Sequence, residues 1–231
     1  MSLIQEIKEA LLHWVYPHTC AGCGAALPNS NTSICFRCLS KMPLTSYVNW
    51  ESNPVEKIFW GRLPIKSAAC AYHFAPNSIM QELLHECKYQ KNKELTIQLG
   101  RLMAEQLVDN PRFNIDVLVP LPLHKSREKK RGYNQAELLC KGMSEVLSIP
   151  VNSHMIKRIA PTKTQTNKSR IERWENMKGK FILGKEQVSN THILLIDDVI
   201  TTGATLEACG HVLLEQKGVQ LSIFALCYAS S

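Results

Sequence analysis

A pair of adjacent carboxylates followed by threonines and small residues carries the clearest chemical signal in the sequence. Asp197 and Asp198 come after a run of apolar residues, and a short polar stretch follows them: Thr201, Thr202, Gly203, Ala204 and Thr205. This order is typical of a buried strand that passes through a tight loop into a helix. The first N–H groups of a helix lack partners within the helix and lie at the positive end of its dipole, so such a loop can bind a phosphate.

The two carboxylates restrict which phosphate compound fits this loop. Asp197 and Asp198 would repel a bare phosphate unless a sugar or a metal ion separates the charges. Carboxylates suit ribose hydroxyls, bound directly or through magnesium, and small residues let the backbone approach a phosphate closely. The pattern therefore favours a ribose 5-phosphate, with the ribose at the aspartates and the phosphate at residues 201–205. The alternative is a plain loop in which the threonines only cap the helix.

Four closely spaced cysteines form a second motif. Cys20 and Cys23 make one C-x-x-C pair, and Cys35 and Cys38 make another. Two such turns can present four thiolates to one point, the tetrahedral arrangement that structural zinc prefers, and four protein ligands leave no open position for chemistry. Two local disulfides or unligated thiols are the alternatives, and His18 is a spare candidate ligand.

The charge of the chain indicates anionic partners. The 231 residues include 27 Lys and Arg against 20 Asp and Glu, a formal net charge of +7. Thirteen of these basic residues fall in the stretches 123–132 and 157–180. Phosphorylated metabolites, nucleic acid and acidic membrane surfaces are the classes of partner that such a balance suits.

The location predicted from the sequence is cytoplasmic. No segment approaches the roughly 20 apolar residues of a membrane span, and residues 1–16 contain charges that interrupt any signal-peptide pattern. The nine cysteines are an odd number, which does not suit a disulfide framework. In a reducing compartment, closely spaced cysteines more often bind metal.

Alternating strands and helices must position these motifs. Apolar runs predict strands at 67–74, 116–121, 154–159, 181–183, 192–196 and 221–227. Helical periodicity and caps predict helices at 2–15, 77–89, 94–108, 134–147 and 203–217. This alternation predicts an α/β fold with a mostly parallel sheet, in which ligands bind beyond the carboxyl ends of the strands. The loops 120–134, 160–180 and 197–205 are expected to converge there.

Three parts of the chain are expected. Residues 1–43 form an N-terminal helix and the zinc-binding module, and residues 44–66, which are rich in proline and poor in periodicity, form a linker. Residues 67–231 form the α/β domain with flanking helices. The long polar stretch 160–180 is unusual for a connection in a compact domain, and loops of that length are commonly functional or disordered.

At this point the motifs resemble a known family. The segment IDDVITTGAT resembles the phosphoribosyl-pyrophosphate (PRPP) motif of type I phosphoribosyltransferases. The four-cysteine module, VPLPLHKSREKKRGYNQAELL and TKTQTNKSRIERWENMKGKF together resemble the ComF family, which includes the competence proteins ComF and ComFC and the related GntX. The resemblance runs from about Cys20 to Tyr228. Lys168 and Thr164 depart from the family pattern, which usually has an apolar residue and often a proline there.

The resemblance implies a type I phosphoribosyltransferase fold with a small zinc-binding module. Asp197 and Asp198 would act as catalytic residues that hold the ribose hydroxyls, with residues 201–205 at the 5-phosphate and magnesium bound together with PRPP. The loop that begins at Pro120 and Leu121 would correspond to the pyrophosphate loop. Basic residues that could offset pyrophosphate charge lie in this loop and in the 160–180 loop: Lys125, Arg127, Arg131, Arg170 and Arg173.

Two classes of function remain open at this stage. The first is transfer of a phosphoribosyl group from PRPP, or another ribose 5-phosphate ligand, to an unknown acceptor, in a protein with an implied role in DNA uptake and natural transformation. The second is a non-catalytic protein that binds single-stranded DNA, or a scaffold for DNA-uptake proteins. Lys129, Lys130 and Arg131 could contact DNA phosphates. Tyr133 and Trp174 could stack on bases, although core packing is the commoner role of such residues.

Overall fold

The fold was obtained as a computed structural model, which describes residues 18–28, 32–159, 179–186 and 188–229. The predicted helix at 2–15 and most of the 160–180 loop lie outside the described residues. Five residues singled out from the sequence therefore also lie outside them: Thr164, Lys168, Arg170, Arg173 and Trp174.

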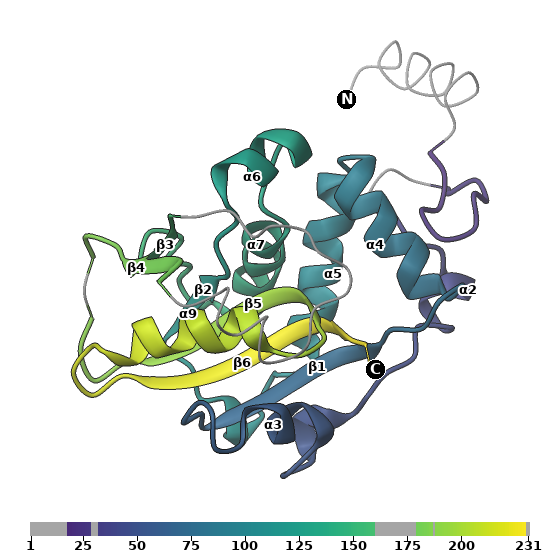
Figure 1. Ribbon diagram of the computed structural model, residues 1–231. Coiled ribbons are helices and arrows are strands. Elements are labelled where there is room, and N and C mark those ends of the chain that lie inside the picture. The colour runs from purple at the N-terminus through teal and green to yellow at the C-terminus, as the bar shows by residue number, and fades with distance from the viewer. Residues whose placement is uncertain (1–17, 29–31, 160–178, 187, 230–231) are drawn as a thin grey trace.

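A four-stranded parallel sheet forms the centre of the molecule. Its strands follow the order β1 (Ser67–His73), β6 (Gln220–Tyr228), β5 (His192–Ile200) and β2 (Val117–Pro120) (Figure 1). All three pairs are parallel, and most residues of each strand are buried. Near-continuous apolar runs are expected for strands covered on both faces, so the predicted α/β fold is confirmed.

Helices cover the sheet from both faces (Figure 1). Helices α4 (Ile79–Tyr89), α5 (Lys93–Glu105) and α7 (Gln135–Leu147) lie on one side. Helix α9 (Ala204–Leu214) lies on the other, because the crossover from β5 to β6 runs along the sheet in the opposite direction to the crossover from β1 to β2. Right-handed crossovers in opposite directions place their helices on opposite faces.

Helices α5 and α7 approach each other very closely. A Cβ atom on Gly100 would lie 2.3 Å from the carbonyl oxygen of Leu139, and one on Gly142 would lie 2.0 Å from that of Ile97. Any side chain at either position would therefore push the two helix backbones apart. This contact fixes α7, and with it the loop that precedes it.

Two short strands predicted from the sequence pair with each other outside the main sheet. Strands β3 (Ile156–Arg158) and β4 (Phe181–Leu183) form a separate antiparallel sheet. In Figure 1 this pair lies near α9 at one end of the main sheet, and the Arg158 guanidinium stacks on the Phe181 ring with Cζ 5.4 Å from the ring centroid.

The segment 44–66, expected as a linker, contains regular structure that packs on the sheet. It holds a 3-10 helix, η1 (Tyr47–Asn49), and helix α3 (Pro54–Phe59). Val55 and Phe59 are completely buried, and the Asn53 side chain caps α3 while donating to the Ala68 carbonyl of β1 at 2.8 Å. The boundaries between the three parts of the chain stay a prediction.

The basic stretch that follows β2 is also more regular than the sequence indicated. Helix α6 (Lys125–Arg131) begins after His124, whose side chain accepts a hydrogen bond from the Ser126 N–H. None of its residues is buried, so it carries no apolar periodicity from which it could be predicted. Two further short elements are α2 (Phe36–Leu39) and the 3-10 helix η2 (Pro111–Phe113). Among the described residues, no helix has the length and apolar character needed to cross a membrane.

Candidate functional site

The paired aspartates lie near the carboxyl end of β5, the central strand predicted to carry them. The strand continues to Ile200, so the predicted end at residue 196 is wrong and both aspartates belong to the strand. The reason is that β6 continues beside them, pairing Asp197 with Ala225 and Ile200 with Tyr228. Side chains in a strand alternate between faces, but the Asp197 carboxylate bends back and accepts a hydrogen bond from the Asp198 N–H at 2.8 Å.

The predicted strand, loop and helix follow in the expected order, and the loop is held in a conformation that requires glycine. Gly203 has a φ of 72° and lies at the N-cap of α9. A Cβ atom there would lie 2.7 Å from Cγ2 of Ile58 and 3.0 Å from Cε1 of Phe59. The N-cap position of α9 is therefore a glycine, and no threonine side chain caps the helix from that position. Within the described part of the chain, the following hydroxyls make no hydrogen bond: those of Thr201, Thr202 and Thr205.

An arginine that sequence analysis did not identify supports this loop. Arg62, which follows α3, donates from Nη1 to the carbonyls of Ile58 at 2.9 Å and Thr202 at 3.3 Å. Its Nη2 forms an ion pair with Glu207 in the first turn of α9. Glu207 is only 3% exposed, so Arg62 neutralises a buried negative charge at the end of the helix that faces the loop. The partners are 145 residues apart, which no local motif reveals.

The predicted pyrophosphate loop leaves the sheet beside the aspartates. Pro120 pairs with Ile196, and the Leu121 N–H donates to the Ile196 carbonyl at 2.8 Å. Asn134 holds the other end of the loop, because its Nδ2 donates to the Leu121 carbonyl at 3.1 Å and its Oδ1 caps α7. Pro120 and Leu121 therefore lie next to Asp197, as the sequence predicted.

The end of helix α4 lies over the same aspartates. Tyr133 donates its hydroxyl to the Cys87 carbonyl, and Gln135 Nε2 donates to the same oxygen at 3.5 Å. The next residue, Lys88, places Nζ 2.8 Å from Oδ2 of Asp198. Tyr133 is only 7% exposed, so its ring packs in the core and is not available to stack on a base.

Burial and neighbouring charges shift the pKa values of Asp197 and Asp198 in opposite directions. Burial and the neighbouring Asp198 charge raise the pKa of Asp197 well above its ordinary value. Burial acts on Asp198 in the same direction, but Lys88 and then Arg131 more than offset it and lower the pKa of Asp198. Burial and the charge of Arg127 lower the pKa of Arg158, whereas Asp197 raises it. The ligand-free site therefore holds its negative charge mainly on Asp198.

The basic residues of α6 are placed unequally. Arg131 lies at the site end, where its Nη1 donates to Oε1 of Gln135 at 2.9 Å. Lys125 is exposed at the start of the helix, and within the described residues its ammonium has no ion-pair partner. The structure thus brings Arg131 close to the aspartates and leaves Lys125 facing solvent.

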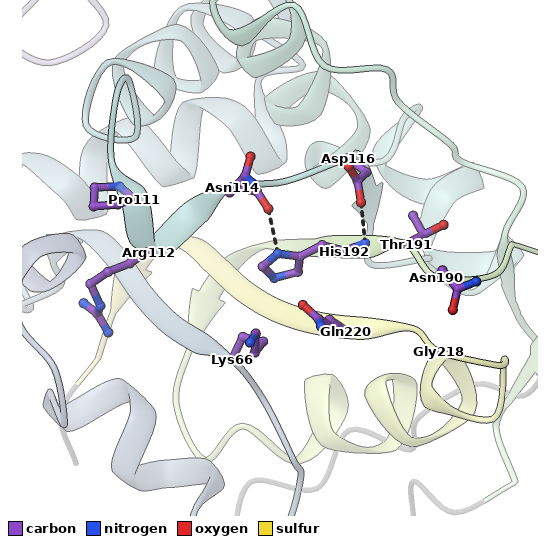
Figure 2. Close-up of a pocket in the computed structure, with 10 residues that line it drawn as sticks. All are labelled: Lys66, Pro111, Arg112, Asn114, Asp116, Asn190, Thr191, His192, Gly218 and Gln220. Atoms are coloured by element: carbon purple, nitrogen blue, oxygen red, sulfur yellow. Dashed lines mark hydrogen bonds between the residues drawn. The ribbon is translucent and has the colours of Figure 1, made fainter.

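A hollow of about 470 Å³ lies at the amino ends of the strands, at the end of the sheet opposite to the aspartates (Figure 2). It is lined by residues at the amino ends of the strands, including His192 of β5, Gln220 of β6 and Lys66 just before β1. The His192 ring nitrogen Nδ1 lies 2.7 Å from the Asn114 carbonyl, and its backbone N–H donates to Asp116. Ligands of parallel α/β sheets bind at the carboxyl ends of the strands, so this hollow is separate from the candidate site.

The four cysteines of the N-terminal motif come together as predicted. The Sγ atoms of Cys20, Cys23, Cys35 and Cys38 all lie within 4.8 Å of one another. All nine cysteines belong to the described residues, and none of them forms a disulfide. Burial opposes ionisation of Cys20, but backbone N–H groups donate to its sulfur, that of Cys35 most strongly, and lower its pKa to about 6. Such a cluster could hold a tetrahedral metal ion.

The cysteine cluster packs against the helices of the main sheet. A Cβ atom on Gly22 would lie 2.4 Å from Cδ1 of Ile79, the first residue of α4. The Ser33 N–H donates to Oε1 of Gln98 in α5 at 2.7 Å. His18 is outside the cluster, and its Nε2 lies 3.1 Å from the Thr32 carbonyl.

Comparison with known proteins agrees with this fold. The phosphoribosyl transferase domain model matches residues 88–231. Among curated relatives, the DNA utilization protein YhgH of Salmonella typhimurium is 29% identical, with 94% of this chain and 92% of the relative covered. Competence protein F of Haemophilus influenzae is 29% identical over 91% of this chain and 84% of its own. Competence protein ComFC of Bacillus subtilis is 40% identical over 65% and 60%.

The chain therefore belongs to the phosphoribosyl transferase domain family and, within it, to the ComF proteins, as the motifs predicted.

The opposite pKa shifts of the two aspartates predict opposite effects on stability. The raised folded pKa of Asp197 means that its contribution to stability falls as pH rises above the unfolded value of about 3.9. Asp197→Asn should therefore raise the free energy of unfolding at pH 7. The lowered pKa of Asp198 stabilises the fold above that value and is lost as pH falls. Asp198→Asn should cost about 1–3 kcal/mol, because it leaves Lys88 without its partner.

Urea unfolding of the ligand-free variants at pH 5 and pH 8 measures both effects. The difference between wild type and Asp197→Asn should grow from pH 5 to pH 8. A larger destabilisation by Asp197→Asn than by Asp198→Asn would contradict this assignment, because it would mean that Asp197 and not Asp198 carries the negative charge.

Proposed function

We propose that this protein binds PRPP with magnesium at the carboxyl end of β5, with the 5-phosphate on the loop 201–205 and the ribose hydroxyls on Asp197 and Asp198. The observation that carries the proposal is the loop itself. Gly203 and Arg62 hold it at a helix N-terminus directly after the two carboxylates. A helix start binds phosphate, and carboxylates accept hydrogen bonds from hydroxyls. A ribose 5-phosphate satisfies both halves at once.

The diphosphate of PRPP would lie on the side of Pro120, Leu121 and Arg131. This side supplies the backbone of the pyrophosphate loop and the positive charge at the end of α6. Lys125 would contribute long-range attraction from the start of the helix, where it is exposed. Magnesium, when bound with PRPP, would neutralise charge on the diphosphate as it leaves. The aspartates and the loop would hold the sugar in place meanwhile.

The biological role in this proposal is DNA uptake and natural transformation, with the cytoplasmic location predicted from the sequence. It is supported by relatives named for DNA utilization and competence. In a transfer reaction, the bond between C1 of the ribose and the diphosphate oxygen breaks and C1 bonds to the acceptor. Pyrophosphate release, tested against bases, nucleotides and single-stranded DNA as acceptors, separates such a transferase from a protein that only binds PRPP.

Isothermal titration calorimetry tests the binding proposal. Wild type should bind PRPP in the presence of magnesium, and Asp197→Asn/Asp198→Asn should bind it at least tenfold more weakly, since each hydrogen bond to a charged group contributes about 1.5–3 kcal/mol. Asp116→Asn is a matched control, because Asp116 lies at the amino end of the strands beside the other hollow. Equal PRPP affinity in the double variant and wild type would remove the proposal.

We also propose that the cysteine cluster binds one structural zinc ion. Four thiols in one group suit zinc and leave no position for substrate. Native protein should contain one zinc per chain by elemental analysis, and Cys20→Ser/Cys38→Ser should contain none and melt at a lower temperature. Cys209→Ala changes a buried thiol outside the cluster and should keep its zinc. A native protein with reduced cluster thiols and no zinc would contradict this assignment.

A second candidate function is binding of single-stranded DNA along α6. The observation that favours it is a helix with no buried residue and with basic side chains throughout its last turn: Lys129, Lys130 and Arg131. Contacts to phosphates release counterions and make affinity depend on salt. Lys129→Gln/Lys130→Gln, which leaves Arg131 at the PRPP site, should weaken binding of an oligonucleotide and reduce the salt slope by about 2. An unchanged affinity and slope would exclude α6 as the DNA contact.

A further inference from the structure

We propose that Lys88 is a ligand-binding residue of this site: it is the counter-ion of Asp198 while the site is empty, and it transfers its ammonium contact to the diphosphate when PRPP binds. The inference rests on the proposed function, since it needs PRPP to bind beside Asp198. It goes further because it assigns a residue that lies outside the PRPP motif and the pyrophosphate loop.

The backbone around Lys88 is fixed in place. Lys88 is the second-last residue of α4, and the carbonyl of Cys87 accepts hydrogen bonds from the Tyr133 hydroxyl and from Gln135. Helix α7, which begins at Gln135, is held in turn by its close contact with α5. Buried contacts therefore hold the part of α4 that places the Lys88 ammonium next to β5.

The Lys88 ammonium can leave Asp198 and contact a ligand instead. Nζ lies 2.8 Å from Oδ2 of Asp198, with the two side chains 20% and 18% exposed. Partial exposure gives an incoming ligand access to the pair. A lysine side chain is a flexible stem with three donors at its end, so Nζ can move to another oxygen nearby while the backbone stays fixed.

The charges around Lys88 and Asp198 include an excess of positive charge that an anion could neutralise. Arg131 is near enough to disfavour the charged form of Lys88 and to favour that of Asp198. Within the described residues, Arg131 has no carboxylate partner and donates instead to the Gln135 amide. Two cations thus share one ionised carboxylate on the side from which the pyrophosphate loop leaves the sheet. A diphosphate in this place would supply the missing negative charge.

This arrangement predicts discrimination between two ligands with the same sugar. PRPP and ribose 5-phosphate share the groups assigned to the 201–205 loop and to Asp197 and Asp198. They differ in the diphosphate on C1. If Lys88 binds the diphosphate, removing its charge should affect PRPP and spare ribose 5-phosphate.

Calorimetric titration of the full chain with each ligand and magnesium tests the assignment. Lys88→Met should weaken PRPP binding roughly 10–100-fold, the range for one lost charge-assisted hydrogen bond, and should change ribose 5-phosphate binding less than about threefold. Lys88→Arg should recover most of the PRPP affinity because it restores a cation. Lys66→Met removes the same charge from an exposed position at the amino ends of the strands and should leave both affinities unchanged.

The other outcomes overturn the assignment. Equal weakening of both ligands would mean that Lys88 only holds Asp198 in place, and no change for PRPP would mean that Lys88 does not contact the ligand. If Lys88→Met does not fold by circular dichroism, Lys88→Gln carries the same prediction. Wild type that binds neither ligand would refute the proposed function and this inference together, whereas wild-type binding with unchanged variants would refute this inference alone.

Discussion

The electrostatic cost of placing several carboxylates beside the loop 201–205 and the start of α9 is the main constraint on this site. Asp197, Asp198 and Glu207 all lie within eleven residues of one another, in or next to the segment that would bind a phosphorylated sugar. Unpaired charges that are buried or partly buried destabilise a fold, so each carboxylate needs compensation. Glu207 is paired with Arg62 and Asp198 with Lys88, whereas Asp197 has its pKa raised towards the neutral form. The result is a site that tolerates two adjacent carboxylates before any ligand arrives.

The compensating cations come from segments that only the tertiary fold brings together. Lys88 reaches β5 from α4 on one face of the sheet, and Arg62 reaches the start of α9 on the other, from the turn after α3. Residues 44–66 therefore support the loop 201–205, in addition to connecting the cysteine cluster to β1. The cluster packs against the start of α4 through Gly22 and Ile79.

Local patterns in the sequence predicted the parts of this structure that depend on local physics. The apolar run before Asp197 and the small residues after it predicted the strand, loop and helix, and the pattern over 134–147 predicted α7, which Asn134 caps. The length of β5 was not predictable, because it depends on β6 running alongside to Tyr228. Helix α6 was missed because it buries no residue. The roles of Lys88 and Arg62 could not be predicted, because their partners lie more than a hundred residues away in the chain.

The most direct test of the proposed PRPP site is a crystal structure of the protein with PRPP and magnesium. This site would hold the 5-phosphate on the N–H groups of residues 201–205, the ribose hydroxyls on Asp197 and Asp198, and the diphosphate on the side of Pro120 and Arg131. PRPP bound in the hollow beside His192 at the amino ends of the strands (Figure 2), or with its ends reversed across β5, would contradict it.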